Sequence, residues 1–242
     1  MTVPPLLRLA GVHTHIGRYH ILHGIDLEVA SGRLTMLLGR NGAVKTTVLR
    51  TIMGLWRRSA GSITFDGTPI DTLATPDIAR LGIAYVPESM GIFQRLTVRE
   101  NLLLATGPAG FAASRLEEVF TLFPALRQKW QVAAGSLSGG QKQMLAIARA
   151  IIEERRLLVI DEPTKGLAPA VIDQLIAALR RLKEQAATIL LVEQNFHLAR
   201  AVGDAVAVMD DGRIIHTGSM EALAADEELQ HRLLGLSLGS HQ

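Results

Sequence analysis

The sequence predicts an α/β fold with a mixed, mostly parallel sheet, an N-terminal antiparallel β part and an inserted helical subdomain. Short apolar segments alternate along the chain with amphipathic helical patterns, which is the order that builds a covered, mostly parallel sheet. Residues 157–160 and 188–192 are almost entirely apolar, as strands buried on both faces are. Residues from about 97 to 150 show helical patterns and no convincing strand, which indicates the helical insertion.

Seven segments are expected to form strands, because each is short, apolar and bounded by turn residues. The pairs Asp66-Gly67 and Asp211-Gly212 are typical of tight turns, and the second pair is expected to close a hairpin between the last two strands. The predicted strands are Leu34–Leu38, Ser62–Phe65, Ile83–Val86, Leu157–Ile160, Thr188–Val192, Ala205–Met209 and Arg213–His216.

Helical patterns separate these strands. Helices are expected over about Lys45–Leu55 and Ser138–Ala150. A third helix begins at Pro169, because proline suits the first helical position, and it carries its apolar residues on one face. A terminal amphipathic helix is expected over Met220–Leu234. We expect residues 1–242 to form one domain.

The composition excludes several classes of protein. The 242 residues carry 25 Lys and Arg against 23 Asp and Glu, a net charge of +2, and 48% of them are hydrophobic, which is the opposite of a disordered chain. The chain has no cysteine, which excludes disulfides, thiol catalysis and cysteine-based zinc sites. The near-zero net charge argues against a nucleic-acid partner.

The sequence shows neither of two features that mark membrane-inserted or secreted chains. No stretch approaches the ~18 apolar residues of a membrane span. Residues 1–15 lack the basic start and apolar run of a signal peptide. We therefore expect a cytoplasmic protein.

A glycine-rich loop follows the predicted strand Leu34–Leu38 and precedes a helix. Such a loop binds phosphate, because consecutive backbone N–H groups surround the anion and the helix N-terminus adds its positive dipole end. A lysine reaches the terminal phosphates and the next hydroxyl binds Mg²⁺, and Lys45 and Thr46 hold these places. The order predicts a P-loop NTPase core. Its predicted phosphate-binding residues are Gly39, Asn41, Gly42, Ala43, Val44, Lys45, Thr46 and Thr47.

One position departs from the phosphate-loop pattern, which has glycine immediately before the lysine. Val44 stands there instead. Glycine permits a positive φ and a close approach to the phosphate, whereas a β-branched residue at positive φ is strained by about 1–3 kcal/mol. The motif alone therefore leaves open an ordinary strand–helix turn.

Two further motifs follow the phosphate loop along the chain. Leu137-Ser138-Gly139-Gly140-Gln141 opens a predicted helix, and Leu157–Ile160 leads into Asp161-Glu162. Together with the phosphate loop, and in this order, they make essentially the whole chain similar to the ATP-binding cassette (ABC) ATPases. The resemblance implies ATP and Mg²⁺ as cofactors.

The resemblance assigns roles to residues at matching positions. It implies Mg²⁺ binding by Thr46, Asp161 and Glu88, which stands where the family has glutamine; a solvated loop acid is the alternative for Glu88. Glu162 is implied to polarise the attacking water. Gln194 takes the place of the family's phosphate-sensing histidine, and its amide can donate a hydrogen bond but does not titrate near neutral pH.

The family's nucleotides are shared between two chains. Two cassettes pair head to tail, so Ser138–Gln141 is implied to contact ATP held by a second cassette, here a paralogue. Pro163–Ala168 occupies the family's D-loop, which lines the seam between cassettes. Tyr19 lies nearest to the position whose aromatic ring stacks on adenine, and packing at the sheet edge is its alternative.

The residues of several segments indicate one branch of the family. Gly166-Leu167-Ala168-Pro169 and Val192-Glu193-Gln194-Asn195 resemble the cassettes of branched-chain amino-acid importers and their urea and amide relatives. This resemblance implies an ATPase coupled to transport of branched-chain or other hydrophobic amino acids. Membrane permease subunits are expected to dock near Glu88–Leu104, with a periplasmic binding protein as an indirect partner. The chain is then peripheral on the inner face of the cell membrane.

Two alternatives stay open at the level of the sequence. Val44 favours a structural or regulatory cassette that binds nucleotide poorly and lends Ser138–Gln141 to its partner. A soluble ABC ATPase of DNA repair or translation is disfavoured, because the chain has one phosphate loop and no long coiled-coil insertion.

Four early histidines have no acidic or cysteine partner and are interpreted as surface residues rather than metal ligands: His13, His15, His20 and His23.

Overall fold

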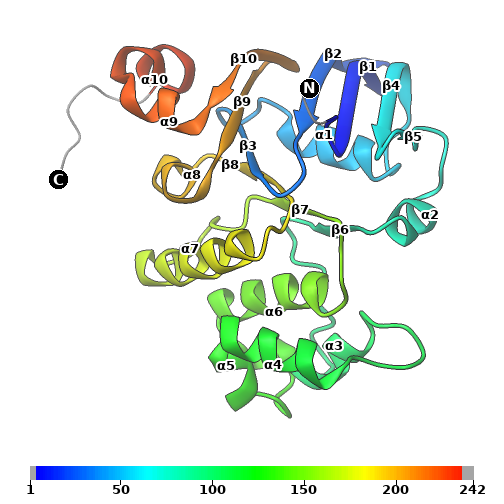
Figure 1. Cartoon of the computed structure of the whole chain (residues 1–242), viewed down its shortest axis with the longest axis vertical. Coiled ribbons are helices and arrows are strands. Elements are labelled where there is room, and N and C mark those ends of the chain that lie inside the picture. The colour runs from blue at the N-terminus through cyan, green and yellow to red at the C-terminus, as the bar shows by residue number, and fades with distance from the viewer. Residues whose placement is uncertain (1–3, 236–242) are drawn as a thin grey trace.

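The computed structural model describes residues 4–235, so residues 1–3 and 236–242 of the expected single domain lie outside it. Two sheets organise the described chain (Figure 1). Sheet A is the predicted N-terminal antiparallel part, with strand order β2-β1-β4-β5. Its strands are β1 (Leu7–Ile16), β2 (Tyr19–Val29), β4 (Arg58–Phe65) and β5 (Thr68–Pro69).

Sheet B is mixed and mostly parallel, as predicted, with strand order β10-β9-β3-β8-β7-β6. The four neighbouring pairs from β9 to β6 are parallel, and β10 runs antiparallel to β9. All seven expected strands are present in one sheet or the other, several of them longer than predicted. The strands of sheet B are β3 (Leu34–Leu38), β6 (Ile83–Val86), β7 (Leu157–Asp161), β8 (Ile189–Glu193), β9 (Ala205–Asp210) and β10 (Arg213–Ser219).

Helices fill the chain between β6 and β7, in agreement with the predicted insertion. In this fully described stretch, the one strand-like pairing is an isolated bridge from Thr97 to Ala133. Figure 1 shows α3 to α6 gathered at the end of the molecule away from sheet A. No helix among the described residues has the length and apolar character to cross a bilayer. The helices are α1 (Lys45–Ile52), α2 (Thr75–Arg80), α3 (Val98–Leu103), α4 (Ala113–Leu122), α5 (Pro124–Gln128), a 3₁₀ helix (Ala134–Ser136), α6 (Gly139–Ile151), α7 (Pro169–Glu184), α8 (Phe196–Val202), α9 (Met220–Ala225) and α10 (Glu227–Leu234).

The central strands of sheet B are buried on both faces, which explains their nearly unbroken apolar sequences. In β8, Ile189 and Leu191 pack into one hydrophobic core, and Leu190 and Val192 pack into another. The first core joins sheet B to helices α3 to α9, and the second joins it to sheet A and α1. Sheet B is thereby a rigid layer whose edges can hold loops in fixed positions.

Two helices differ from the prediction. The terminal helix expected over Met220–Leu234 is two helices, because Asp226 between them has an extended backbone (φ −113°, ψ 92°). The Asp226 carboxylate caps α10 by accepting the Leu229 N–H over 2.8 Å. Helix α1 ends at Ile52, earlier than predicted, because Gly54 has a φ of 69° that a helix cannot continue.

Both predicted Asp-Gly turns are present. Asp66 and Gly67 have φ of 50° and 74°, and Asp211 and Gly212 have φ of 41° and 71°. Two consecutive positive φ angles are typical of two-residue turns between twisted antiparallel strands. The second turn closes the expected hairpin of β9 and β10.

Candidate functional site

The carboxyl ends of three neighbouring parallel strands, β3, β8 and β7, meet at one edge of sheet B. Leu38 pairs with Glu193, and Val192 pairs with Asp161, so the loops after these strands start side by side. In open parallel sheets, ligands bind outside this edge. The edge brings together the phosphate loop, the predicted metal ligand and the predicted catalytic residues, which lie far apart in the sequence.

The phosphate loop alternates in backbone hand, as an anion-binding loop does. Gly42 has a φ of 85° and Val44 a φ of 59°, whereas Ala43 between them has no positive φ. Val44 immediately precedes α1 in the left-handed region, with a ψ of 28°. The structure therefore confirms that this position needs a positive φ. Holding a valine there costs about 1–3 kcal/mol.

Two glycines of the loop are required for different reasons. A Cβ on Gly39 would overlap the carbonyl oxygen of Met209 in β9, so packing excludes a side chain there. A Cβ on Gly42 would meet no atom within 4 Å, so the left-handed backbone is the requirement at that position. The space beside Gly42 is open to a ligand.

Lys45 is buried inside the loop, with 4% of its side chain exposed. Its Nζ donates to the carbonyl oxygens of Gly39 over 2.8 Å and Arg40 over 3.2 Å. The same Nζ lies 3.4 Å from Oε1 of Glu162. These contacts match the three donors of an ammonium group, and a phosphate is the kind of anion that this buried positive charge favours.

Thr46 and Asp161 meet beside the lysine. Thr46 Oγ1 donates to Oδ1 of Asp161 over 3.1 Å, and the Tyr85 hydroxyl donates to Oδ2 over 3.3 Å. Asp161 is fully buried. Burial raises the pKa of Asp161 to about 6, opposed by the Thr46 hydrogen bond and assisted by the charge of Glu162. Burial, followed by the charge of Asp161, raises the pKa of Tyr85 to about 12.

These donors suit a small, hard cation. The hydroxyl of Thr46 and the carboxylate of Asp161 offer oxygen ligands, which Mg²⁺ prefers. A carboxyl group whose ionisation is opposed by burial gains strongly from a cation beside it. Glu88 is near enough for its charge to help raise the pKa of Asp161. Thr46 and Asp161 therefore present donors that suit Mg²⁺, whereas the Glu88 carboxylate is paired with Lys165.

Glu162 leaves β7 in a left-handed conformation, with a φ of 42°, which is strained for a residue other than glycine. Its N–H donates to the carbonyl oxygen of Val192 over 2.9 Å, which holds it against β8. Gln194 Nε2 donates to Oε1 of Glu162 over 2.9 Å. The two predicted catalytic side chains are thus in direct contact.

Glu88 lies in the loop after β6 and pairs with Lys165 of the D-loop, Oε1 to Nζ over 2.5 Å. The two side chains are 40% and 62% exposed, so this pair adds little to stability. The hydrogen bond and charge of Glu88 raise the pKa of Lys165, and the charges of Glu162 and Asp161 act in the same direction. Lys165 therefore brings a positive charge close to the acidic residues of the site.

The Ser138–Gln141 motif caps helix α6. Ser138 Oγ accepts the Gln141 N–H over 3.3 Å, and Gln141 Oε1 accepts the Ser138 N–H over 3.1 Å, which is a capping box. Gly140 is required by packing, because a Cβ there would lie 2.5 Å from Val171 of α7. Within the described residues these contacts are to α6 and α7, so the motif is not joined to the phosphate loop of its own chain.

Tyr19 begins β2 at the edge of sheet A and is 62% exposed. The guanidinium of Arg18 lies over its ring, 5.4 Å from the centroid. Its ring is therefore a surface group rather than a core group. The histidines lie nearby on sheet A: His15 and His20 stack with 4.3 Å between centroids, and His13 Nδ1 lies 3.0 Å from His20 Nε2. No group of three or more His, Cys, Asp or Glu side chains in residues 4–235 has the arrangement of a metal site.

Three residues of the site were missed by sequence reasoning: Tyr85, Lys165 and Glu193. Glu193 is 2% exposed at the end of β8. A charged residue directly after a buried apolar strand is the signal that identifies it, since a buried charge needs partners. The contacts of Tyr85 and Lys165 depend on how separate strands and loops pack, which the sequence pattern does not indicate.

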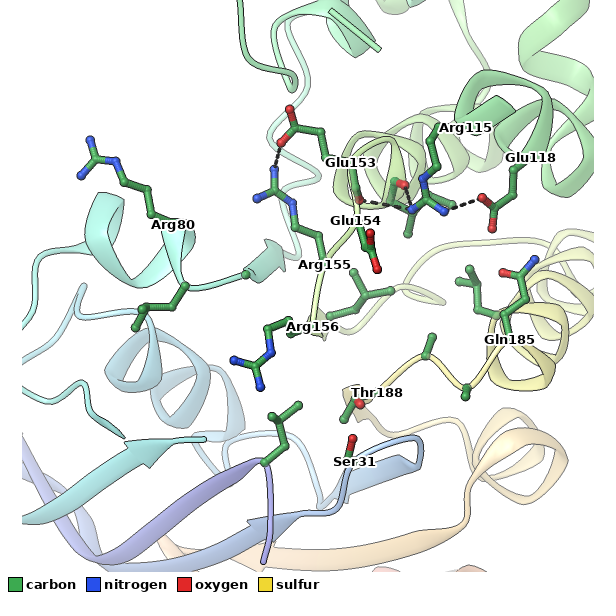
Figure 2. Close-up of a pocket in the computed structure, with 18 residues that line it drawn as sticks. Ser31, Arg80, Arg115, Glu118, Glu153, Glu154, Arg155, Arg156, Gln185 and Thr188 are labelled. Carbon is green, nitrogen blue, oxygen red and sulfur yellow. Dashed lines mark hydrogen bonds and ion pairs between the residues drawn. The ribbon is translucent and has the colours of Figure 1, made fainter. Parts of the chain in front are cut away.

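Another concave region lies at the amino ends of the strands of sheet B (Figure 2). A cavity of about 810 Å³ is lined there by residues that precede β3, β6, β7 and β8. Two ion pairs join charged side chains of its lining, Arg115 with Glu118 over 2.5 Å and Arg155 with Glu153 over 2.6 Å. This cavity contains no residue of the site at the carboxyl ends of the strands.

Comparison with known proteins agrees with this geometry. A family model described as ABC transporter matches residues 22–165. The chain is 36% identical to the high-affinity branched-chain amino acid transport ATP-binding protein BraG of Pseudomonas aeruginosa, over 95% of this chain and 100% of that protein. It is 32% identical to the probable branched-chain amino acid transport ATP-binding protein LivF of Archaeoglobus fulgidus, over 96% of this chain and 99% of that protein.

A solved structure is similar over the same extent. It is the ADP conformation of an ATP-binding cassette of an ABC transporter, and it covers 97% of this chain and 100% of its own, with a TM-score of 0.81 and 24% identity. Likeness at this identity shows the fold, and it confirms the predicted P-loop NTPase architecture. The family model and the full-length relatives show more: the chain belongs to the ABC transporter family, as an ATP-binding subunit.

Proposed function

We propose that the chain is the ATP-binding and ATP-hydrolysing subunit of an importer for branched-chain or other hydrophobic amino acids. One observation carries the catalytic part: Lys45 and Gln194 both approach the same carboxylate oxygen of Glu162. A cation for the phosphates, a carboxylate for the water and a hydrogen-bond donor are what phosphoryl transfer to water requires. Full-length relatives named for branched-chain amino acid transport support the substrate class.

ATP binds at the phosphate loop and the N-terminus of α1. Lys45 exchanges its neutral carbonyl partners in the loop for phosphate oxygens, because these carry negative charge and bind an ammonium group more strongly. Thr46, Asp161 and Glu88 would hold Mg²⁺, which when bound neutralises charge on the phosphates. Tyr19 offers an exposed ring for stacking on adenine.

Hydrolysis divides two roles between neighbouring side chains. Glu162 accepts the proton of the attacking water, because a carboxylate can act as a general base. Gln194 cannot take up a proton near neutral pH, so it orients Glu162 and the water by donating hydrogen bonds. Its present hydrogen bond to Glu162 supports this division.

A second cassette, a paralogue paired head to tail, completes each site. Ser138–Gln141 stands at the N-terminus of the thirteen-residue helix α6, where backbone N–H groups and the helix dipole favour an anion. Among the described residues, no hydrogen bond or ion pair joins it to its own chain's phosphate loop, which supports a role toward ATP on the other chain. The D-loop, Pro163–Ala168, then lies at the seam.

Membrane permease subunits dock near Glu88–Leu104, and a periplasmic binding protein acts through them. Large apolar side chains are exposed in this segment: Phe93 is 48% exposed, Leu103 40% and Leu104 58%. Large apolar side chains left exposed within one segment favour a protein partner. The chain is then held on the inner face of the cell membrane by that partner.

Purification of the chain with its native partners tests this proposal. We expect a second cassette and membrane subunits in the complex, ATP hydrolysis by the complex, and loss of nucleotide binding in Lys45→Ala. Recovery of the chain with ribosomes or DNA and without a membrane subunit would overturn the transport role. ATP binding unaffected by Lys45→Ala would overturn the assignment of the nucleotide site.

A second candidate function is favoured by the strained Val44 in the phosphate loop. In this alternative, the chain is a structural or regulatory cassette whose own site binds nucleotide weakly, while Ser138–Gln141 serves the partner's ATP. Nucleotide affinity of the unchanged chain and of Val44→Gly distinguishes the two functions. Equal tight binding by both excludes the alternative, and tight binding by Val44→Gly alone supports it.

A further inference from the structure

We propose that Glu193 is a positioning residue that joins the D-loop to the loop carrying Gln194; the inference rests on the proposed ATPase function. Glu193 Oε1 accepts the Thr164 N–H over 2.9 Å. Its Oε2 accepts the N–H groups of Gln194 over 2.9 Å and Asn195 over 3.1 Å. One side chain thus binds the backbone of two loops at the same time.

The chemistry of a carboxylate makes this bridge specific. Glu193 is 2% exposed, and burying a charge is costly unless hydrogen bonds compensate it. Three backbone donors provide that compensation, and bonds to an ionised acceptor are the stronger kind. A carboxylate has two acceptor oxygens, whereas a glutamine amide has one oxygen and an NH₂ group that only donates. Glutamine at this position therefore cannot accept from both loops.

The bridge lies where the sheet no longer connects the two loops. The ladder between β7 and β8 ends at the pair Asp161 and Val192, and one more bond follows, from Glu162 N–H to the Val192 carbonyl. Beyond that point, Glu193 supplies the connection to the D-loop through Thr164. Glu193 thereby holds the two loops together beyond the point where strand pairing ends.

Glu193 acts on the site through other residues. Gln194, whose N–H it binds, donates its side-chain amide to Glu162. Thr164, at the other end of the bridge, follows Glu162 by two residues in the chain. The bridge therefore fixes both the donor that orients Glu162 and the segment that leaves it. Since the D-loop lines the proposed cassette seam, the same bridge couples the seam to the catalytic pair.

Amide hydrogen exchange on the full chain tests the bridge directly, without nucleotide turnover. In Glu193→Gln we expect exchange to rise at least about tenfold at Thr164, at Gln194 and Asn195, or at both, the factor that losing a bond to a charged acceptor implies. Amides inside β8 should be unchanged. Glu184→Gln, an exposed change on α7, is the matched control and should alter none of these amides.

Glu193→Asp separates the two halves of the bridge and covers the case in which the glutamine variant does not fold. A shorter aspartate still accepts from the N–H two residues ahead, as aspartates do in turns, but no longer reaches Thr164. We expect faster exchange at the Thr164 amide alone. Unchanged exchange at Thr164 in both variants would overturn the proposal.

Steady-state hydrolysis by the assembled complex tests the positioning role. In Glu193→Gln we expect kcat to fall about tenfold or more, with KM for ATP within about twofold. In a Gln194→Ala background the same substitution should have a clearly smaller effect, because coupled residues are not additive. The positioning role would be overturned if the effects of Glu193→Gln and Gln194→Ala on kcat were fully additive. It would also be overturned if KM for ATP changed as much as kcat. A wild-type complex without ATPase activity would refute the proposed function instead, and the exchange data would still judge the bridge.

Discussion

The side-chain amide of Gln194 donates a hydrogen bond to Glu162, Nε2 to Oε1, over 2.9 Å. The same carboxylate oxygen lies 3.4 Å from Nζ of Lys45. Glu162 is therefore held between the phosphate-loop lysine and Gln194. The segments that follow β3, β7 and β8 each contribute one of the three groups, so the contact depends on the order of these strands in sheet B.

Replacing Glu162 by glutamine should stop ATP hydrolysis and leave nucleotide binding intact. The amide keeps the size of the side chain but cannot accept the proton of the attacking water. We expect turnover to fall at least about a hundredfold, the usual contribution of a positioned base, and cassette pairs to persist in ATP. Size-exclusion chromatography and phosphate release measure the two effects. Retained turnover would show that another group is the base.

Replacing Val44 should reveal why glycine is usual at that position. Val44→Gly removes both the strain at φ 59° and the two methyl groups, and we expect it to raise nucleotide affinity. Val44→Ala is the matched variant, because it keeps a Cβ at positive φ but removes the methyl groups. Calorimetric titration with ATP compares the three chains. An alanine variant that binds like Val44→Gly identifies crowding as the cause, and one that binds like the unchanged chain identifies backbone strain.

The buried Asp161 should make stability fall as pH rises toward neutrality. Its pKa is about 6 in the folded chain against an ordinary value of 3.8, so the folded state binds the proton more tightly than the unfolded state. Below about pH 3 the carboxyl group is protonated in both states. Between about pH 4 and pH 6 the free energy of unfolding should therefore decline, by at most about 3 kcal/mol from this group.

Asp161→Asn should remove that decline, because an amide does not ionise. Urea unfolding in EDTA at pH 4, 5, 6 and 7 measures the difference between the variant and the unchanged chain. Glu184→Gln, an exposed acid on α7, controls for loss of one negative charge. A difference between Asp161→Asn and the unchanged chain that is constant across this range would contradict the raised pKa.

Replacing Leu104 by serine should weaken docking to the permease. Leu104 is 58% exposed and lies in the proposed docking segment. Losing its contact with a partner costs about 1.5–3 kcal/mol if the side chain becomes fully buried there. Leu55 is 50% exposed and lies outside that segment, so Leu55→Ser is the matched control. Co-purification of the membrane subunit with each variant is the measurement, and an equal yield with both variants would contradict the docking site.

Local sequence predicted most of the secondary structure, because the signals are local. The strands Leu34–Leu38 and Ile83–Val86 were predicted to the residue, since apolar segments between turn residues have few other conformations. Both Asp-Gly turns were predicted because the signal for such a turn lies in the two residues themselves. The terminal helix was predicted wrongly, because Asp226 interrupts it and an aspartate tolerates both a helix interior and a cap.

The candidate site divides in the same way. The phosphate loop and the capping motif Ser138–Gln141 could be predicted, since their conformations arise within short segments. The positive φ of Val44 agrees with one of the two reasons for glycine at that position, the other being close approach of the phosphate. The contacts of Tyr85 with Asp161, of Glu88 with Lys165 and of Gln194 with Glu162 were not predictable from pattern.

By itself, the sequence determined the strands, the helical insertion, the phosphate loop and the chemical types of the residues that follow β7 and β8. The tertiary structure decided which of those residues touch. Residues such as Thr164 and Glu193 come together because β7 and β8 are parallel neighbours, whose carboxyl ends meet at one edge. That adjacency is a property of strand order in sheet B, and strand order depends on packing between segments more than a hundred residues apart, such as β3 and β8.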